Sequence, residues 1–154
     1  MIDALLYSLS NFATSSDPSV DEEVARVISE FHAEKKAMAF CCIAPVLVAL
    51  VLGKNGTKVT LVKDLNRLQI CRTFPSHSFQ VKLTLGKTGE KWPYGGTIEK
   101  VTELGCECVE MEVSEVCVDE ENKIVSSPAF MYDGAFHEIQ DGVSKMIDEL
   151  VKIV

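Results

Sequence analysis

The sequence predicts an α/β protein in which helices cover a mainly parallel sheet. Segments with apolar residues at helical spacing alternate along the chain with short strand-like segments, the pattern of a parallel sheet with helical connections. The 154 residues are 47% hydrophobic and 25% charged, which supports one buried core and excludes a disordered or low-complexity chain. The formal charge of −8 disfavours nucleic acid and anionic membranes as partners.

The N-terminal elements follow from caps and apolar spacing. Ser19 and Glu22 predict a capping box, after which apolar residues recur at helical spacing through residue 34. The apolar run that follows predicts a buried strand over 37–42 and a helix over 43–52, which Gly53 ends.

The middle of the chain contains two similar strand-like phrases around an irregular stretch. Residues 58–62 and 81–85 carry Lys-Val-Thr-Leu and Lys-Leu-Thr-Leu, and both predict strands. Residues 63–80 show no clear period, so we interpret them as an irregular insert in one domain over 1–154.

The C-terminal part predicts short strands framed by two helices. Thr97 is expected to cap a helix over 97–104 that ends at Gly105. Apolar residues from Phe136 onward predict the closing helix over 136–154. The three strands expected between these helices are 109–113, 116–119 and 124–126.

The cysteine pattern indicates a reducing compartment and no metal. Six cysteines lie at positions 41, 42, 71, 106, 108 and 117, and adjacent Cys41 and Cys42 do not resemble a secreted disulfide framework. Cys106-Glu-Cys108 lacks zinc-knuckle spacing and has no histidine nearby, so no metal site is predicted. No apolar run is long enough for a membrane span.

Cys42 is the leading candidate for chemistry. It stands where a strand gives way abruptly to a helix, so its side chain would project above the sheet toward free helix amides that favour a thiolate. Cys41 still belongs to the strand. The competing interpretation is a buried structural cysteine, because cysteine is among the most buried residue types.

Partners and a pocket for this thiol are less clearly marked. His32, His77 and His137 are the histidines that could serve as its base, although each also suits a solvated position. Residues 91–97, with Trp92, form either a packed turn or a pocket mouth, and 126–131 follow a strand at a place where ligands bind.

An ordered set of motifs resembles a known family. The motifs are Leu9-Ser10-Asn11-Phe12-Ala13, Cys41-Cys42-Ile43-Ala44-Pro45, Lys91-Trp92-Pro93-Tyr94-Gly95-Gly96-Thr97 and the run from Val118 to Met131. Together they resemble the C-terminal part of the ElbB glyoxalase-like proteins and their ES-one relatives. These belong to the class I glutamine amidotransferase-like superfamily, with the Parkinsonism-associated deglycase and intracellular protease-like proteins.

The resemblance implies a flavodoxin-like three-layer sandwich with a mostly parallel sheet. It further implies a nucleophile-elbow cysteine at Cys42. From the geometry of such an elbow we expect the Ile43 amide to be the oxyanion donor. From their places before a helix and after a strand we expect Trp92, Pro128 and Ala129 to contact substrate. The implied activity is a glyoxalase or deglycase reaction on a small aldehyde, without metal or organic cofactor.

The resemblance also implies what differs in this chain. Relatives carry an N-terminal half with an acidic residue that hydrogen-bonds the cysteine, so we expect an N-terminally truncated, incomplete domain with little or no activity. The alternative function is a non-enzymatic redox-sensitive or association module. A homodimer is expected, because absent strands would leave sheet edges exposed. The animal relatives are mitochondrial, but residues 1–16 hold no Lys or Arg, so no transit peptide is expected and the cytosol is the alternative.

Overall fold

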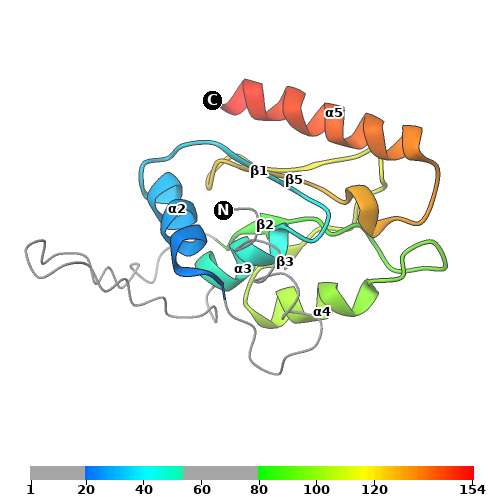
Figure 1. Ribbon diagram of the computed structural model, residues 1–154, viewed down its shortest axis with the longest axis horizontal. Coiled ribbons are helices and arrows are strands. Elements are labelled where there is room, and N and C mark those ends of the chain that lie inside the picture. The colour runs from blue at the N-terminus through cyan, green and yellow to red at the C-terminus, as the bar shows by residue number, and fades with distance from the viewer. Residues whose placement is uncertain (1–19, 54–79) are drawn as a thin grey trace, which may run out of the picture.

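The computed structural model describes residues 20–53 and 80–154, which form three layers. Figure 1 shows α5 on one side of the strands and α2, α3 and α4 on the other. The elements are α2 (Glu22–Ala33), β1 (Met38–Cys41), α3 (Pro45–Leu52), β2 (Lys82–Leu83), α4 (Gly95–Glu103), β3 (Glu107–Cys108), β4 (Cys117–Asp119), β5 (Ile124–Ser127), the 3-10 helix η1 (Ala129–Met131) and α5 (Phe136–Ile153). Within these residues no helix is both long and apolar enough to cross a membrane.

The main sheet has the order β1-β5-β4 and mixes parallel with antiparallel pairing. β1 runs parallel to β5, with Met38 opposite Ile124 and Cys41 opposite Ser127, while β4 and β5 form an antiparallel hairpin. β2 and β3 make a separate parallel pair. Because β1 and β5 are parallel, Cys41 and Ser127 reach the same edge of the sheet, and both chains turn away there.

Side chains join the two sheets. The buried carboxylate of Asp119 accepts a hydrogen bond from the amide of Lys82 at 2.8 Å, and the buried Ser126 hydroxyl accepts one from the amide of Thr84 at 2.9 Å. Since an unpaired buried amide would cost about 1–3 kcal/mol, these two bonds fix the start of β2 against the hairpin.

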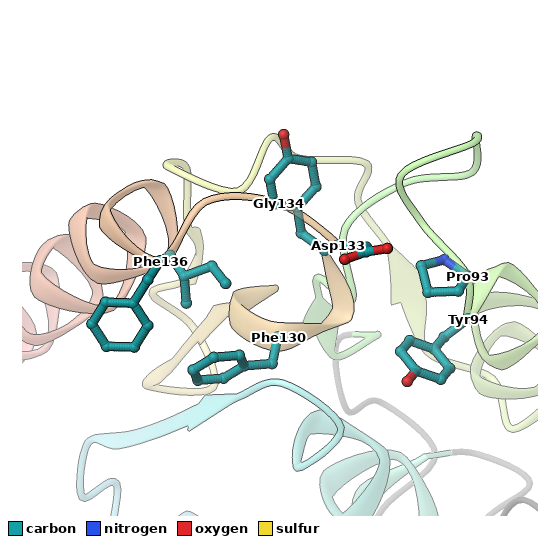
Figure 2. A pocket seen from close by; sticks show the side chains of 8 residues that line it. Pro93, Tyr94, Phe130, Asp133, Gly134 and Phe136 are labelled. Carbon is teal, nitrogen blue, oxygen red and sulfur yellow. The ribbon is translucent and has the colours of Figure 1, made fainter.

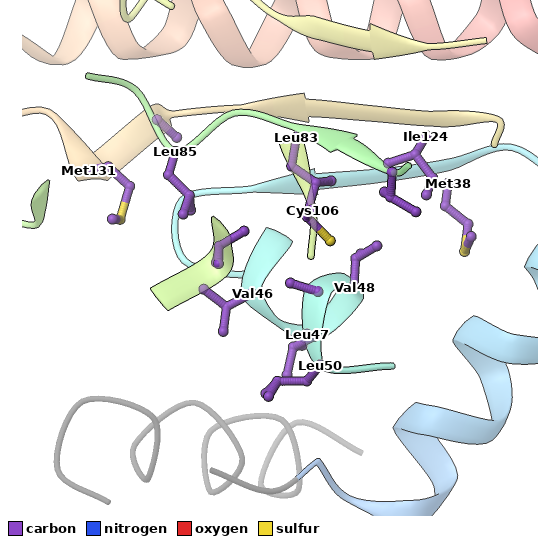
Figure 3. Packing of buried hydrophobic residues seen from close by; sticks show 14 of the residues in the cluster. Met38, Val46, Leu47, Val48, Leu50, Leu83, Leu85, Cys106, Ile124 and Met131 are labelled. Atoms are coloured by element: carbon purple, nitrogen blue, oxygen red, sulfur yellow. The ribbon is translucent and has the colours of Figure 1, made fainter. Parts of the chain in front are cut away.

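The core lies between the strands and α3. Every residue of α3 is apolar, and its first six side chains are buried, which is why this helix shows no polar face. Figure 3 shows Met38, Leu83 and Ile124 from the strands pointing toward α3. Pro45 starts the helix without cost, because a first-turn position needs no amide partner.

The opposite face of the sheet is covered by α5, and Gly142 of this helix packs closely against the turn at Val113. A Cβ at this position would lie 2.0 Å from the carbonyl oxygen of Val113. Ile139 and Met146 flank the glycine on the same helix face and are buried. The missing side chain therefore allows α5 to contact backbone.

The structure confirms the predicted α/β class and the mainly parallel pairing. The helices expected over 20–34, 43–52 and 136–154 correspond to α2, α3 and α5, and the strand expected over 37–42 is β1. The strands expected over 116–119 and 124–126 are β4 and β5. The predicted strand 58–62 and the insert, apart from exposed Gln80, lie outside the described residues.

Two predicted helix caps are wrong. Asp21 caps α2, because its carboxylate accepts from the amides of Glu23 and Val24, so the helix begins later than a Ser19 capping box requires. The helix expected over 97–104 is α4, which begins at Gly95 rather than after Thr97, and its N-cap Tyr94 makes no side-chain hydrogen bond.

The predicted strand over 109–113 is also wrong. Its apolar alternation is real, but the available partner, β2, is only two residues long. The ladder therefore ends as the Val109 amide bonds to the Leu83 carbonyl, and β3 is confined to Glu107–Cys108. The strand expected over 81–85 is shortened to β2, because the amides of Lys82 and Thr84 bond to the side chains of Asp119 and Ser126 rather than to the backbone of a neighbouring strand.

Candidate functional site

Cys42 lies at the sharp turn between β1 and α3 in a left-handed backbone conformation. Its φ angle is 59°, a region that costs an ordinary residue about 1–2 kcal/mol. The Cys42 amide donates to the Ser127 carbonyl at 3.1 Å, and the Ala44 amide donates back to the Cys41 carbonyl at 3.1 Å. These two bonds close the turn and hold the strained residue in place.

The thiols differ in their surroundings. Cys42 is half-buried, whereas Cys106 and Cys117 are buried. Burial raises the pKa of Cys106 to about 12 and that of Cys117 to about 11. Burial also raises the pKa of Cys41, and the neighbouring Cys42 raises it further. Three of these thiols are therefore held in the protonated, unreactive form at neutral pH.

The amide of Ile43 is available next to Cys42. Of the backbone amides from Cys42 to Leu47, those of residues 42, 44, 46 and 47 donate to carbonyls, and Pro45 has none. Within the described residues the Ile43 amide has no acceptor. An unpaired amide beside the thiol is the kind of group that stabilises an oxyanion.

The histidines considered as a base for Cys42 are not brought to it. His32 Nε2 lies 3.1 Å from Asn122 Oδ1, at the opposite end of β5 from Ser127. His137 is exposed in the first turn of α5, and His77 lies outside the described residues. In the part of the chain that the structure describes, no hydrogen bond reaches the Cys42 thiol and no cluster of metal-binding side chains occurs.

The segment after β5 was not expected to be strained. Ala129 has a φ angle of 45° and is fully buried, and the buried hydroxyl of Ser127 has no hydrogen-bond partner among the described residues. Neither feature has a sequence signal, because alanine and serine rarely mark left-handed or unsatisfied positions.

Beside η1 lies an open depression of about 440 Å³, which we call the η1 depression. Figure 2 shows Phe130 and Phe136 at one side of it, Pro93 and Tyr94 at the other, and Asp133 between. The full set of lining residues is Pro93, Tyr94, Phe130, Tyr132, Asp133, Gly134, Phe136 and Ile139.

The residues predicted to contact substrate lie behind this surface. Pro128 and Ala129 are fully buried, and Trp92 is 5% exposed, with its ring 5.1 Å from that of Tyr132. None of the three lines the depression, whereas Pro93, next to Trp92, and Phe130, next to Ala129, do. A substrate role for them stays a prediction, and the structure gives all three a packing role.

Comparisons with known proteins place the chain among relatives. No family model matches it. The rat "ES1 protein homolog, mitochondrial" is 37% identical over 147 residues, which span 95% of this chain and 47% of the relative. The human "Glutamine amidotransferase-like class 1 domain-containing protein 3, mitochondrial" is also 37% identical, over 95% of this chain and 46% of its own length.

The chain is a homologue of the ES1 proteins. A zebrafish ES1 protein is 25% identical over 97% of this chain and 49% of its own length. The fold resembles that of an isoprenoid biosynthesis protein with amidotransferase-like domain from Ehrlichia chaffeensis, with a TM-score of 0.65 and 20% identity. That match covers 94% of this chain and 52% of the bacterial one.

These comparisons confirm the resemblance to the ES-one proteins and the amidotransferase-like, flavodoxin-like α/β fold. The chain spans about half the length of the ES1 proteins it matches. The names of the rat, human and zebrafish relatives place those proteins in mitochondria.

Proposed function

We propose that this ES1 homologue carries the nucleophile of a glyoxalase-like or deglycase-like site that acts on small reactive aldehydes. The observation that supports the proposal is the left-handed backbone at Cys42, with φ of 59° at the turn from β1 to α3. Strain at a non-glycine residue persists where surrounding structure enforces it, and such strain clusters at active sites.

The chemistry follows from the two groups at this turn. The Cys42 thiolate adds to one aldehyde carbon of glyoxal, and the carbonyl electron pair moves to oxygen to give a hemithioacetal. The Ile43 amide, which has no acceptor among the described residues, is placed to stabilise the oxyanion that forms.

The remaining steps are a proton transfer and a hydrolysis. Removal of the hydrogen from the sulfur-bearing carbon gives an enediol, and protonation of the second carbon gives a thioester of glycolic acid. Water then cleaves the carbon–sulfur bond, releasing glycolate and regenerating the thiol. The two proton movements need a base, and no hydrogen bond to Cys42 from the described residues supplies one. We therefore propose that this chain by itself turns over slowly or not at all.

The adjacent cysteines provide a matched test. Cys42→Ser should abolish glyoxal turnover, measured as glycolate formed, whereas Cys41→Ser should retain it, because Cys41 is a strand residue with a raised thiol pKa. If the chain alone shows no turnover, the wild type and the two variants are instead incubated with glyoxal, and mass spectrometry measures how much glyoxal each protein binds covalently. Equal capture by the wild type and by Cys42→Ser would contradict the proposal.

A second candidate function is association through α5, with Cys42 as a redox-sensitive thiol. Ile147, Val151 and Val154 are 48%, 70% and 91% exposed and recur at spacings of four and three residues along one side of the helix. This spacing suits a seam between two helices, so a homodimer is the partner we propose for this surface. Ile147→Lys should then shift the sedimentation coefficient to that of a monomer, and an unchanged coefficient would contradict this second function.

The mitochondrion is the compartment we propose. The support is that the rat, human and zebrafish relatives are all named as mitochondrial proteins. Fractionation of cells that express the tagged chain would test it, with recovery in the cytosol as the contrary result.

A further inference from the structure

Three exposed aromatic rings surround the η1 depression. Tyr94 is 54% exposed, Phe130 57% and Phe136 68%. The rings of Phe130 and Phe136 lie 6.2 Å apart and are tilted by 45°, so they form two walls rather than one flat stack. Exposed aromatics gathered around one hollow indicate a recognition surface, whereas isolated apolar residues do not.

The charged side chain that lines this depression is an acid. Asp133 lines it, and in the described part of the chain its carboxylate takes part in no hydrogen bond or ion pair. Figure 2 shows this carboxylate lying between Phe130 and Pro93. An acid at a hollow with aromatic walls favours a ligand that is both cationic and apolar.

The nearby start of α5 would otherwise favour an anion. The amides at this helix end carry partial positive charge, but the carboxylate of Glu138 already lies there and accepts a hydrogen bond from the Ala135 amide at 3.2 Å. A second carboxylate thus occupies the helix end, and an anionic ligand would meet both Glu138 and Asp133.

A cation of the protein itself, the ammonium of Lys91, already contacts one of the aromatic rings that line the depression. The ammonium of Lys91 lies 5.6 Å from the centre of the Tyr132 ring and 3.2 Å from the Tyr132 hydroxyl. The pKa of Lys91 is raised, first by that hydroxyl and then by acids that include Asp133. Tyr132 also lines the depression, and Lys91 forms no ion pair with Asp133, so that carboxylate still has room for an external cation.

We propose that the η1 depression binds an organic cation of the alkylammonium class, seated against the rings of Tyr94, Phe130 and Phe136 with Asp133 as its counter-charge. A volume of about 440 Å³ accommodates a substituted ammonium. Rings of this kind attract cations through their negative faces. Cys42 does not line the depression, and the proposal does not depend on the Cys42 chemistry.

The test compares choline with 3,3-dimethyl-1-butanol, its uncharged carbon analogue. Binding to the full chain is followed residue by residue through amide chemical shifts in NMR spectra. Choline should bind in the millimolar range, with shifts concentrated at Asp133, Gly134 and Phe136. The neutral analogue should bind at least about threefold more weakly, because it lacks the cation–π term.

Variants separate charge from general effects. Asp133→Asn should weaken choline binding by about twofold to fivefold, whereas Asp148→Asn, the same charge change at a position on α5 that does not line the depression, should not. Phe130→Leu should weaken it by about threefold, and Phe31→Leu on α2 should leave it unchanged. The same NMR spectra show whether each variant keeps the fold of the wild type.

Several results would overturn the proposal. These are equal affinity for choline and its neutral analogue, equal losses in the Asp133 and Asp148 variants, choline shifts that map away from the depression, and absence of saturable binding. Shifts at the lining residues that grow with protein concentration and exclude choline would assign the surface to a second copy instead.

Discussion

Replacing Gly142 by alanine should destabilise the protein, although alanine is the better helix former. A Cβ at Gly142 would lie 2.0 Å from the Val113 carbonyl oxygen and 3.4 Å from the Ser127 hydroxyl oxygen. Because real Cβ atoms essentially never approach a neighbour within 3.0 Å, α5 would have to move away from Val113 by about 1 Å. The obstacle is backbone, so no rotamer change can relieve it.

The magnitude follows from two opposing terms. Alanine gains up to about 1 kcal/mol of helix propensity over glycine. Overpacking of this kind costs about 1–3 kcal/mol or more, and moving α5 also loosens the contacts of Ile139 and Met146, which are 4% and 5% exposed. We expect a net loss of about 2 kcal/mol, which lowers Tm by about 4–8 °C for a chain of this size.

The assay is urea unfolding followed by tryptophan fluorescence, together with thermal melting followed by circular dichroism. Trp92 is the chain's single tryptophan and is buried, so its emission reports loss of the fold. Gly96→Ala is the matched control: this glycine is also in a helix, α4, and a Cβ there meets nothing within 4 Å. That variant should keep Tm or raise it by about 2–4 °C. If Gly142→Ala is as stable as Gly96→Ala, α5 does not contact the Val113 backbone and the reasoning fails.

The remaining predictions concern the cysteines. In urea unfolding, Cys42→Gly should lose about 1–2 kcal/mol less unfolding free energy than Cys41→Gly. The reason is that glycine relieves the left-handed φ at position 42, whereas Cys41 lies in a strand. Equal losses would show that Cys42 is unstrained. Iodoacetamide at pH 8 should modify half-buried Cys42 before buried Cys106 and Cys117 in the native protein, as peptide mass spectra would show, and the reverse order would contradict the burial described above. Stability should fall as pH rises above about 8.5, where thiols in the unfolded chain ionise. In the folded chain burial raises the pKa of Cys106 to about 12 and that of Cys117 to about 11. The folded chain therefore retains protons that the unfolded chain has released, and rising pH favours unfolding. The fall in urea midpoint from pH 7 to pH 10 should be smaller in Cys106→Ala, and an identical fall in that variant would refute the assignment.

Sequence patterns predicted those elements whose signal is local. α5 is amphipathic over its whole length and α3 is apolar throughout, so spacing and composition alone locate both helices. The turn at Cys42 was predicted for the same reason, since a short apolar strand runs into a helix that Pro45 can start. The position of the turn was thus readable, whereas its left-handed φ was not.

What the sequence could not supply depends on distant partners. Residues 109–113 alternate as a strand should, yet they form none, because pairing requires a β2 longer than two residues. Asp and Ser are both favoured at N-cap positions, so the sequence alone does not decide between Asp21 and Ser19. In the structure α2 begins at Glu22, and Asp21 is its N-cap. The η1 depression combines Tyr94 from the start of α4 with Phe130 and Phe136, and no periodicity connects these positions.

The distribution of backbone strain argues that one edge of the sheet is shaped for function. Lys35 and Lys123 also have positive φ, but they precede the strands β1 and β5, Lys35 in the turn after α2 and Lys123 in the turn between β4 and β5. Cys42 and Ala129 differ, because both follow the parallel strands β1 and β5 at the same edge and the Cys42 amide bonds to Ser127, two residues before Ala129. Two strained residues cost about 2–4 kcal/mol together, a large share of the stability of a small domain. A chain selected for stability alone would relieve that cost with glycine at either position, so its retention beside a half-buried thiol favours a role for this edge in binding or chemistry.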